Sequence, residues 1–445
     1  MPSWLAAAAG YLPRWLEFQM RLHEQPGCVI AIGHRGRLVL EEAFGYANAA
    51  TRERLTPRHR FRVASHSKSF TAAGIMKLAE HGKLRLGDRA GRYVGGLHPA
   101  VARVSIAELL SHRAGIVRDG PDAQQFVDRR PFLDEEELRA QLKAPPILKR
   151  NARFKYSNHG YGLLGLVLEG IARERFRDWI GREIIAAARL RETTPDMPLG
   201  GRVPFARGHT GILPTGRRVI PGDFYTHAIA PAGGFVSTAA DLVRFYSQLS
   251  PRAKNSILSV ASRRAMVRAR WRDPHSSIER YYGLGVMSGT VSGRQWFGHS
   301  GGLQGYITRT LVLPREEIAI AVLTNSIDGL AHPWIEGAVH IVDAFARGGA
   351  PSRSLRRWRG RWWTLWNAVD LVPVRGKVLV AMPALFNPLL DASEVRGGRI
   401  VLAGGYASHG EPARLGRNEL WLGGTRYVRE AALAREMRSR YRGVS

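Results

Sequence analysis

The chain has 445 residues, of which 44% are hydrophobic and 23% are charged. These values are typical of globular proteins and exclude a disordered or collagen-like chain, while the length allows two or three domains. No apolar stretch approaches the roughly 20 residues needed to span a bilayer. The net charge of +29 comes mainly from 58 arginines spread along the whole chain, whereas a nucleic-acid-binding surface is a local basic patch. The spread argues against a nucleic-acid partner.

Helix and hairpin signals fill the first half of the chain. Apolar residues at helical spacing predict an amphipathic helix over residues 11–24. A hairpin follows, with strands over Val29–Ile32 and Leu38–Phe44. Three helical segments are predicted after it. The first spans Phe70–His81, the second begins at a capping box formed by Ser105 and Glu108, and the third spans 159–190.

The pattern then turns from helix to strand. Thr238–Leu249 is a predicted helix with Thr238 as its N-cap. Two segments rich in β-branched residues, Tyr306–Leu313 and Ile318–Thr324, are predicted strands, and a helix over Pro333–Arg347 follows them. Strands from both ends of this region must therefore meet in one sheet.

The last hundred residues differ in character from the rest. Residues 348–357 are a predicted linker, and short strand candidates lie beyond it between Gly-rich turns, at Val378–Met382, Ile400–Ala403, Leu420–Leu422 and Tyr427–Val428. We expect a main domain over 1–347 and a small β-rich module over 358–445.

A run of alternating arginine and tryptophan at Arg356–Trp363 opens this module. Such a run can bind single-stranded nucleic acid or an anionic membrane surface. The structural alternative, which we favour, is that the tryptophans pack the module onto the main domain while the arginines stay solvated.

Cysteine and histidine patterns limit the chemistry. The single cysteine, Cys28, excludes an internal disulfide and a Cys-rich zinc site, and the histidines show no metal-binding spacing. No metal or other cofactor is therefore expected. The apolar patch Leu5–Ala9 has no basic residue before it, which is unlike a signal peptide. We expect a cytoplasmic protein, or a periplasmic one if translation starts elsewhere.

Ser65 and Lys68 form the central chemical signal. On a helix, residues at i and i+3 share a face, so the lysine amine lies one turn from the serine hydroxyl. A desolvated, neutral lysine can take the hydroxyl proton. Ser-x-x-Lys occurs once in the chain, and its structural alternative is a capping serine followed by a surface lysine.

Tyr156 and Asn158 lie directly before the helical stretch that begins near Gly160. A phenol at this place can move a proton between nucleophile and leaving group, and a carboxamide can donate to a substrate carbonyl while it contacts the lysine. On its own, the pair is equally typical of a buried structural tyrosine.

The third element is the Gly-rich segment Gly298–Gly302, which contains His299, Ser300 and Gly301 and precedes the strand that starts near Tyr306. Small residues let the backbone approach a substrate, and the N–H groups of Ser65 and Gly302 are candidates for an oxyanion hole. The segment also matches Gly-x-Ser-x-Gly. An α/β-hydrolase elbow with Ser300 as nucleophile would need a helix after it, whereas the following residues favour a strand.

Together the three elements resemble the motifs of the active-site-serine β-lactamase and penicillin-binding protein superfamily. The match is to its class C branch, which includes D,D-carboxypeptidases, D-aminopeptidases and esterases. Four further stretches fit this family: Phe61–Phe70, Gly82–Val94, Ile106–Gly115 and Ala232–Phe245. The resemblance covers about residues 12–345 and implies an α+β fold, in which helices flank an antiparallel sheet beside an all-helical lobe.

The resemblance also implies a role for each motif residue. Ser65 would be the acylated nucleophile, with Lys68 and Tyr156 transferring protons. Asn158, His299, Ser300 and Gly301 would bind the substrate, while the N–H groups of Ser65 and Gly302 would hold the oxyanion.

Two departures from the family pattern bear on the substrate. His299 stands where classical β-lactamases carry lysine, so the site is expected to lack a fixed cation for a β-lactam carboxylate. The second departure is the expected lack of a signal peptide, which would separate the protein from cell-wall substrates. Esters and small D-amino-acid amides or short peptides become the expected substrates. The alternatives are a weak β-lactamase or penicillin-binding D,D-peptidase, and a non-catalytic peptide- or polyanion-binding protein on the same fold. The oligomeric state is left open.

Overall fold

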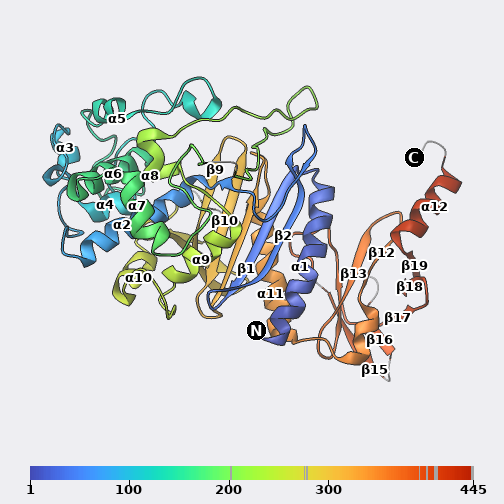
Figure 1. Cartoon of the computed structure of the whole chain (residues 1–445). Helices are drawn as coiled ribbons and strands as arrows, with labels where there is room; N and C mark the ends of the chain where they lie inside the picture. Colours follow the sequence, from blue (N-terminus) through green and yellow to red (C-terminus); the bar gives the residue numbers. More distant parts are fainter. Residues whose placement is uncertain are drawn as a thin grey trace. The chain divides into compact units, whose positions relative to one another are not determined.

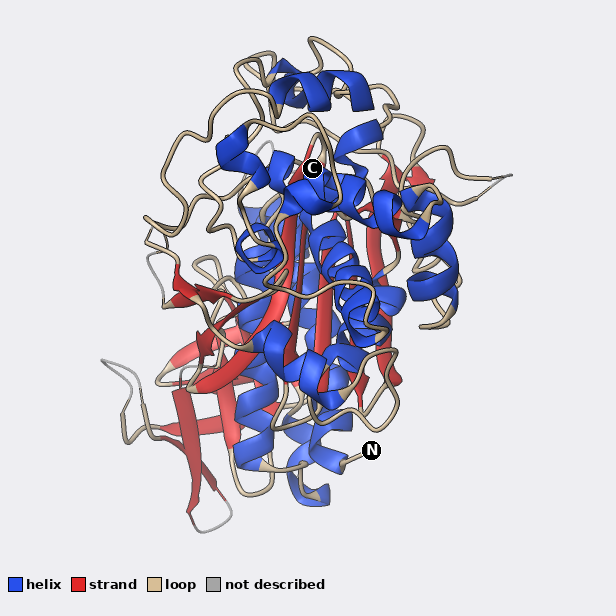
Figure 2. Cartoon of the chain, turned by 90° about the vertical axis from the view of Figure 1, so that its left-hand side faces the viewer, coloured by secondary structure: helices blue, strands red, loops and turns tan. Residues whose placement is uncertain are grey.

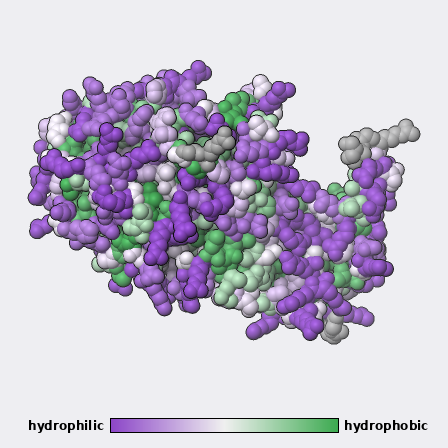
Figure 3. Space-filling view, viewed as in Figure 1, coloured by the Kyte–Doolittle hydropathy of each residue, from purple (hydrophilic) through white to green (hydrophobic). Residues whose placement is uncertain are grey.

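The structure is a computed structural model, and it describes residues 1–200, 203–274, 276, 279–389, 391–396, 399–404 and 409–441. Its contacts divide the chain (Figure 1) into a larger unit, Gln25–Ile335, and a smaller unit made of Met1–Glu24 and Glu336–Ser445. Among the described residues, no helix is both long and apolar enough to cross a membrane. The face drawn in Figure 3 is mostly hydrophilic.

The larger unit contains a nine-stranded antiparallel sheet. In spatial order its strands are β3 (Glu53–Arg54), β2 (Arg37–Asn48), β1 (Gly27–His34), β11 (Ile318–Thr324), β10 (Tyr306–Leu313), β9 (Arg294–Leu303), β8 (Met287–Val291), β7 (Arg280–Tyr282) and β6 (Trp271–Arg272). The predicted hairpin is confirmed as β1 and β2, and the turn residues Arg35 and Gly36 both have positive φ, which matches the strand twist. Strands far apart in sequence do meet, since Val29 of β1 pairs with Leu323 of β11.

Helices of the larger unit pack on one another and on the sheet. They are α2 (Ser67–Glu80), α3 (Pro99–Ala102), α4 (Ile106–Leu110), α5 (Glu135–Gln141), α6 (Asn158–Ala172), α7 (Phe176–Ile180), α8 (Ala230–Gly233), α9 (Ala239–Leu249) and α10 (Val260–Val267). Helices α2, α6 and α8 contact one another, while α9 packs on β1 and β11. Figure 1 shows the group around α2 beside the sheet, and Figure 2 shows it in front of the strands. One hydrophobic core joins helices and sheet.

The predicted helical elements are present, with one interruption. Ser105 and Glu108 form the expected capping box at α4. The region 159–190 is helical in pieces, because Arg173 adopts a left-handed conformation (φ 56°) and ends α6 before α7 begins.

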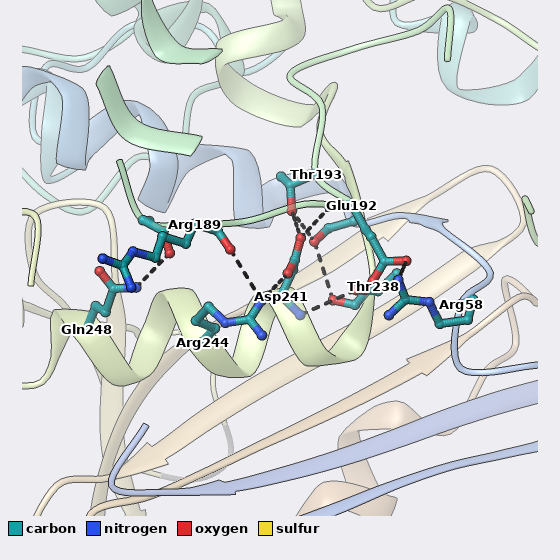
Figure 4. A network of polar contacts seen from close by, with 10 residues as sticks. Arg58, Arg189, Glu192, Thr193, Thr238, Asp241, Arg244 and Gln248 are labelled. Atoms are coloured by element: carbon teal, nitrogen blue, oxygen red, sulfur yellow. Dashed lines mark hydrogen bonds and ion pairs between the residues drawn. The ribbon is translucent and has the colours of Figure 1, made fainter. Parts of the chain in front are cut away.

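The start of α9 is fixed by a buried carboxylate (Figure 4). Thr238 caps the helix by accepting from the Asp241 N–H, as predicted. The Asp241 carboxylate, 1% exposed, accepts from the Glu192 N–H at 2.7 Å and from Thr193 Oγ1 at 3.0 Å. Arg244 Nη1 donates to its other oxygen at 2.7 Å. These contacts tie the loop before α8 to the helix that covers the sheet.

The smaller unit combines α1 (Ser3–Leu22), most of α11 (Ala331–Gly348) and a barrel. The closed barrel contains β12 (Gly360–Trp363), β13 (Ala368–Pro373), β14 (Val378–Ala381), β15 (Asp391–Arg396), β16 (Arg399–Leu402), β17 (Pro412–Leu415), β18 (Glu419–Leu422) and β19 (Thr425–Val428). Helix α12 (Glu430–Arg440) follows it. The four strand candidates correspond to β14, β16, β18 and β19.

The grouping of α1 with the barrel differs from the division expected from sequence, which set the boundary at 348–357. Trp15 Nε1 donates to the Leu385 carbonyl at 3.1 Å, and Gln19 Nε2 donates to the Pro383 carbonyl at 2.7 Å. Tyr11 Oη donates to Asp370 at 3.1 Å. These buried contacts assign the first helix to the smaller unit.

The tryptophans of the Arg356–Trp363 run lie inside this unit. Trp358 and Trp362 belong to the core of the barrel. The Arg361 guanidinium binds the buried Asp370 carboxylate at 2.7 and 2.8 Å. Trp358, Trp362 and Arg361 therefore stabilise the barrel itself, while Arg356 and Arg357 are exposed.

Candidate active site

Ser65 lies in a short 3-10 turn, Ala64–His66, at the start of α2. Ala64, directly before it, has φ 48°, a conformation that costs a non-glycine residue energy and marks a constrained backbone. Ser67 fixes this turn, because its Oγ donates to the Ala64 carbonyl at 2.5 Å and accepts from the Phe235 N–H at 3.0 Å. The half-buried Ser65 side chain is thus held at a helix N-terminus, whose field favours developing negative charge.

Lys68 faces Ser65 as the i, i+3 spacing predicts. Its fully buried Nζ donates to Ser65 Oγ at 3.2 Å, to Asn158 Oδ1 at 2.7 Å and to the Ala232 carbonyl at 2.7 Å. Burial lowers the pKa of Lys68 well below its usual value. An amine that loses its proton readily at this place can accept the proton of Ser65.

Tyr156 approaches Ser65 from another side. Its Oη donates to Ser65 Oγ at 2.8 Å, and its ring centroid lies 4.7 Å from Lys68 Nζ and 4.2 Å from the His112 ring. Burial raises the pKa of Tyr156 above its usual value. The phenol therefore keeps its proton at neutral pH and is suited to donate it.

Asn158 begins α6 directly behind the lysine. Ser157 caps this helix by accepting from the Gly160 N–H at 2.9 Å. Asn158 Oδ1 accepts from Lys68, and Asn158 Nδ2 donates to Asp119 Oδ1 at 2.5 Å. Asp119 was not predicted from the sequence, since no motif or spacing points to a single acidic residue in an irregular segment.

The Gly298–Gly302 segment precedes the strand that starts at Tyr306, as expected, and is itself part of another strand, β9, which was not predicted. Ser300 pairs with Arg309 of β10 in the middle of this strand. A nucleophile elbow needs a strand followed by a helix, so the elbow hypothesis with Ser300 as nucleophile is wrong. Ser300 Oγ lies 3.8 Å from Met287 Sδ.

His299 is 1% exposed, and its Nε2 lies 3.0 Å from Tyr282 Oη. Its Nδ1 lies 3.0 Å from the Ser300 backbone nitrogen and 2.7 Å from the Ser300 carbonyl oxygen. Burial lowers the pKa of His299 to about 3. The imidazole is therefore neutral at physiological pH and supplies no fixed positive charge.

Gly301 and Gly302 bring the backbone of β9 close to the nucleophile segment. A Cβ at Gly301 would lie 2.2 Å from the Val63 carbonyl oxygen, two residues before Ser65, so only glycine fits there. Gly302 is exposed, and a Cβ there would meet only Ile307, at 3.5 Å. Gly302 thus lies open to solvent on the strand that approaches the nucleophile segment.

The predicted site residues therefore fall into two groups. Ser65, Lys68, Tyr156 and Asn158 form one continuous hydrogen-bonded cluster. His299, Ser300, Gly301 and Gly302 lie on the adjoining strand β9, which contacts the 3-10 turn that carries Ser65. Among the described residues, no three histidine, cysteine or acidic side chains are arranged to hold a metal ion.

A family model described as Beta-lactamase matches residues 14–332. The chain belongs to the beta-lactamase family. The match covers more than half of the chain and confirms the resemblance found in the motifs.

Curated relatives are distant. The chain is 29% identical over 325 residues to penicillin-binding protein 4 of Amycolatopsis lactamdurans, which covers 68% of this chain and 81% of that protein. It is 25% identical over 183 residues to protein flp of Staphylococcus aureus strain MW2, covering 40% of this chain. The matches span only 36% of that flp protein and 61% of the flp protein of strain N315.

Solved structures show the same fold. The octameric penicillin-binding protein homologue from Pyrococcus abyssi matches with a TM-score of 0.68 and 23% identity, over 94% of this chain and 99% of that one. The D-amino acid amidase of Ochrobactrum anthropi SV3 has a TM-score of 0.65 and 20% identity, over 76% and 99%. The class C beta lactamase of Rhodobacter sphaeroides has a TM-score of 0.61 and 19% identity, over 77% and 99%.

Proposed function

We propose that this member of the beta-lactamase family is a serine hydrolase that forms an acyl-enzyme on Ser65. The observation that carries the proposal is that Ser65 Oγ is contacted by two proton-transfer groups at once, Lys68 Nζ at 3.2 Å and Tyr156 Oη at 2.8 Å. A nucleophile within hydrogen-bond reach of both a base and an acid is the arrangement that acyl transfer requires.

The reaction begins when neutral Lys68 takes the Ser65 proton and Oγ attacks the substrate carbonyl. The N–H groups of Ser65 and Gly302 hold the resulting oxyanion at the N-terminus of α2. Tyr156 donates its proton to the leaving alcohol or amine as the tetrahedral intermediate collapses, and Lys68 returns a proton to the phenol. Water then attacks the acyl group, loses a proton to the same pair and releases Ser65 with its proton restored.

The charge of the site favours some substrates over others. Because His299 is neutral, that position offers no cation for a β-lactam carboxylate. We therefore propose an ester or a small D-amino-acid-type amide or short peptide as substrate. A weak β-lactamase or penicillin-binding peptidase is the second candidate, since the fold is shared with a class C beta lactamase.

Covalent labelling tests the proposal. The purified protein is exposed separately to a fluorophosphonate, a penicillin and an activated short-chain ester, followed by intact mass and peptide mapping. We expect a fluorophosphonate adduct on Ser65, its loss in Ser65→Ala, and its retention in Ser300→Ala. A penicillin adduct that persists indicates a penicillin-binding enzyme. Labelling at another residue, or none with a folded protein, contradicts the proposal and favours a binding protein.

A further inference from the structure

Asp119 connects the proposed active site to the protein surface. Its carboxylate is 7% exposed, and Oδ1 accepts from Asn158 Nδ2 at 2.5 Å. Arg118 Nε lies 2.9 Å from the other oxygen, and the Arg118 side chain is 62% exposed. An unbroken series of contacts thus leads from a surface guanidinium through a carboxylate and an amide to Lys68.

The Asp119 carboxylate decides which end of the Asn158 amide faces the lysine. An ionised carboxylate only accepts hydrogen bonds, so it selects Nδ2 and leaves Oδ1 for Lys68 Nζ, 2.7 Å away. The reversed amide would set two oxygens against each other and two donors against each other. The Arg118 carbonyl holds the same helix start, because it accepts from the Asn158 N–H at 2.9 Å.

The groups around Lys68 differ in charge. The carboxylate of Asp119 raises the lysine pKa and the guanidinium of Arg118 lowers it, both against a background set by burial. His112 and His299 also interact electrostatically with Lys68, and burial lowers the pKa of both, so they are neutral.

Two aromatic rings complete these surroundings. The rings of Tyr156 and Tyr161 lie 4.7 and 5.5 Å from Lys68 Nζ, and burial raises the pKa of both phenols. Since these phenols are neutral as well, the ionised groups that act on the lysine are Asp119 and Arg118.

We propose that Asp119 is a positioning residue of this hydrolase, which orients the Asn158 amide toward Lys68, and that Arg118 opposes its charge, so that the pair adjusts the basicity of the site. The proposal rests on the proposed function. It assigns a role to a residue that touches neither the nucleophile nor the substrate carbonyl.

The test is the pH dependence of the rate constant for Ser65 labelling by a fluorophosphonate. Labelling requires the neutral lysine, so the rate rises as pH increases through the Lys68 pKa. Asp119→Asn removes the negative charge, and we expect the rising limb to move to lower pH while the plateau falls about tenfold, because the amide is no longer fixed. Arg118→Gln removes the opposing charge, and we expect the limb to move to higher pH with a similar plateau.

Shifts of the pH–rate profile in opposite directions in the two variants distinguish this role from a structural one. A loss of packing would lower the labelling rate but would not move the profile to lower pH in one variant and to higher pH in the other. Asp122→Asn, at an acidic residue paired with Arg130 at 3.4 Å, is the matched control and should leave the profile unchanged. If Asp119→Asn does not fold, the exposed Arg118→Gln variant decides by itself.

The proposal is overturned if the rising part of the pH–rate profile stays unchanged in the folded variants, or moves in the same direction in both. Labelling of Ser65 in the wild type would then still support the proposed hydrolase function. No labelling of Ser65 in the wild type refutes both.

Discussion

The contact between Gly301 and the Val63 carbonyl gives the sharpest test of how the site is built. In Gly301→Ala the new Cβ would lie 2.2 Å from that oxygen and 2.5 Å from Thr308 Oγ1, where ordinary contacts begin near 3.4 Å. Thr308 lies on the strand paired with β9, but Val63 belongs to the segment that carries Ser65. Strand β9 and the nucleophile segment must therefore separate by about 1 Å, a misplacement that can cost about 100-fold in rate.

The assay measures the labelling rate constant of Ser65 and the free energy of unfolding in urea. We expect Gly301→Ala to label about 100-fold more slowly and to lose about 1–3 kcal/mol of stability from overpacking. Gly33→Ala is the matched control, because its Cβ would lie 2.5 Å from Val243 Cγ1 at the contact of β1 with α9. The control should lose stability while labelling normally. A folded Gly301→Ala protein that labels at the wild-type rate would refute the reasoning.

Three further predictions concern the proton donor, a buried carboxylate and the histidines. Tyr156→Phe removes the donor to Ser65 Oγ, and we expect turnover of an amide to fall about 10²- to 10⁴-fold with an unchanged melting temperature; normal turnover would exclude its proposed role. Asp241→Ala leaves the buried Glu192 N–H without an acceptor, and urea unfolding should show a loss of about 1–3 kcal/mol, whereas unchanged stability would contradict this. Burial lowers the pKa of His299 to about 3 and of His159 to about 4, so the unfolded chain binds more protons below pH 6.5. As the pH decreases from 6.5 to the folded pKa, the free energy of unfolding should fall by about 1.4 kcal/mol per pH unit for each histidine. This decrease should be less steep in His159→Gln.

Sequence spacing was sufficient where the site is local. Ser65 and Lys68 lie one helical turn apart, so their contact followed from the periodicity alone. The contact of Tyr156 with Ser65 joins residues 91 positions apart and was predicted only through the family resemblance. Asp119 could not be found in either way, because its contact with Asn158 depends on the path of an irregular segment between α4 and α6.

Strand β9 shows a conflict between local and tertiary preferences. Its three glycines weaken the strand signal, and the segment was not predicted to be a strand itself. In the structure the close approach of Val63 requires glycine within the strand. Several barrel strands were missed for another reason, since β12 spans only Gly360–Trp363 and its apolar pattern is too short to distinguish from a turn.

The smaller unit is assembled from both ends of the chain, and this has a consequence for synthesis on the ribosome. Helix α1 is made before its partners Pro383, Leu385 and Asp370, which follow more than 340 residues later. At about 5–20 residues per second, that interval is roughly 20–70 s. During this time the buried face of α1, with Trp15 and Leu12, lacks these partners, so the nascent chain presents a hydrophobic helix that chaperones can bind.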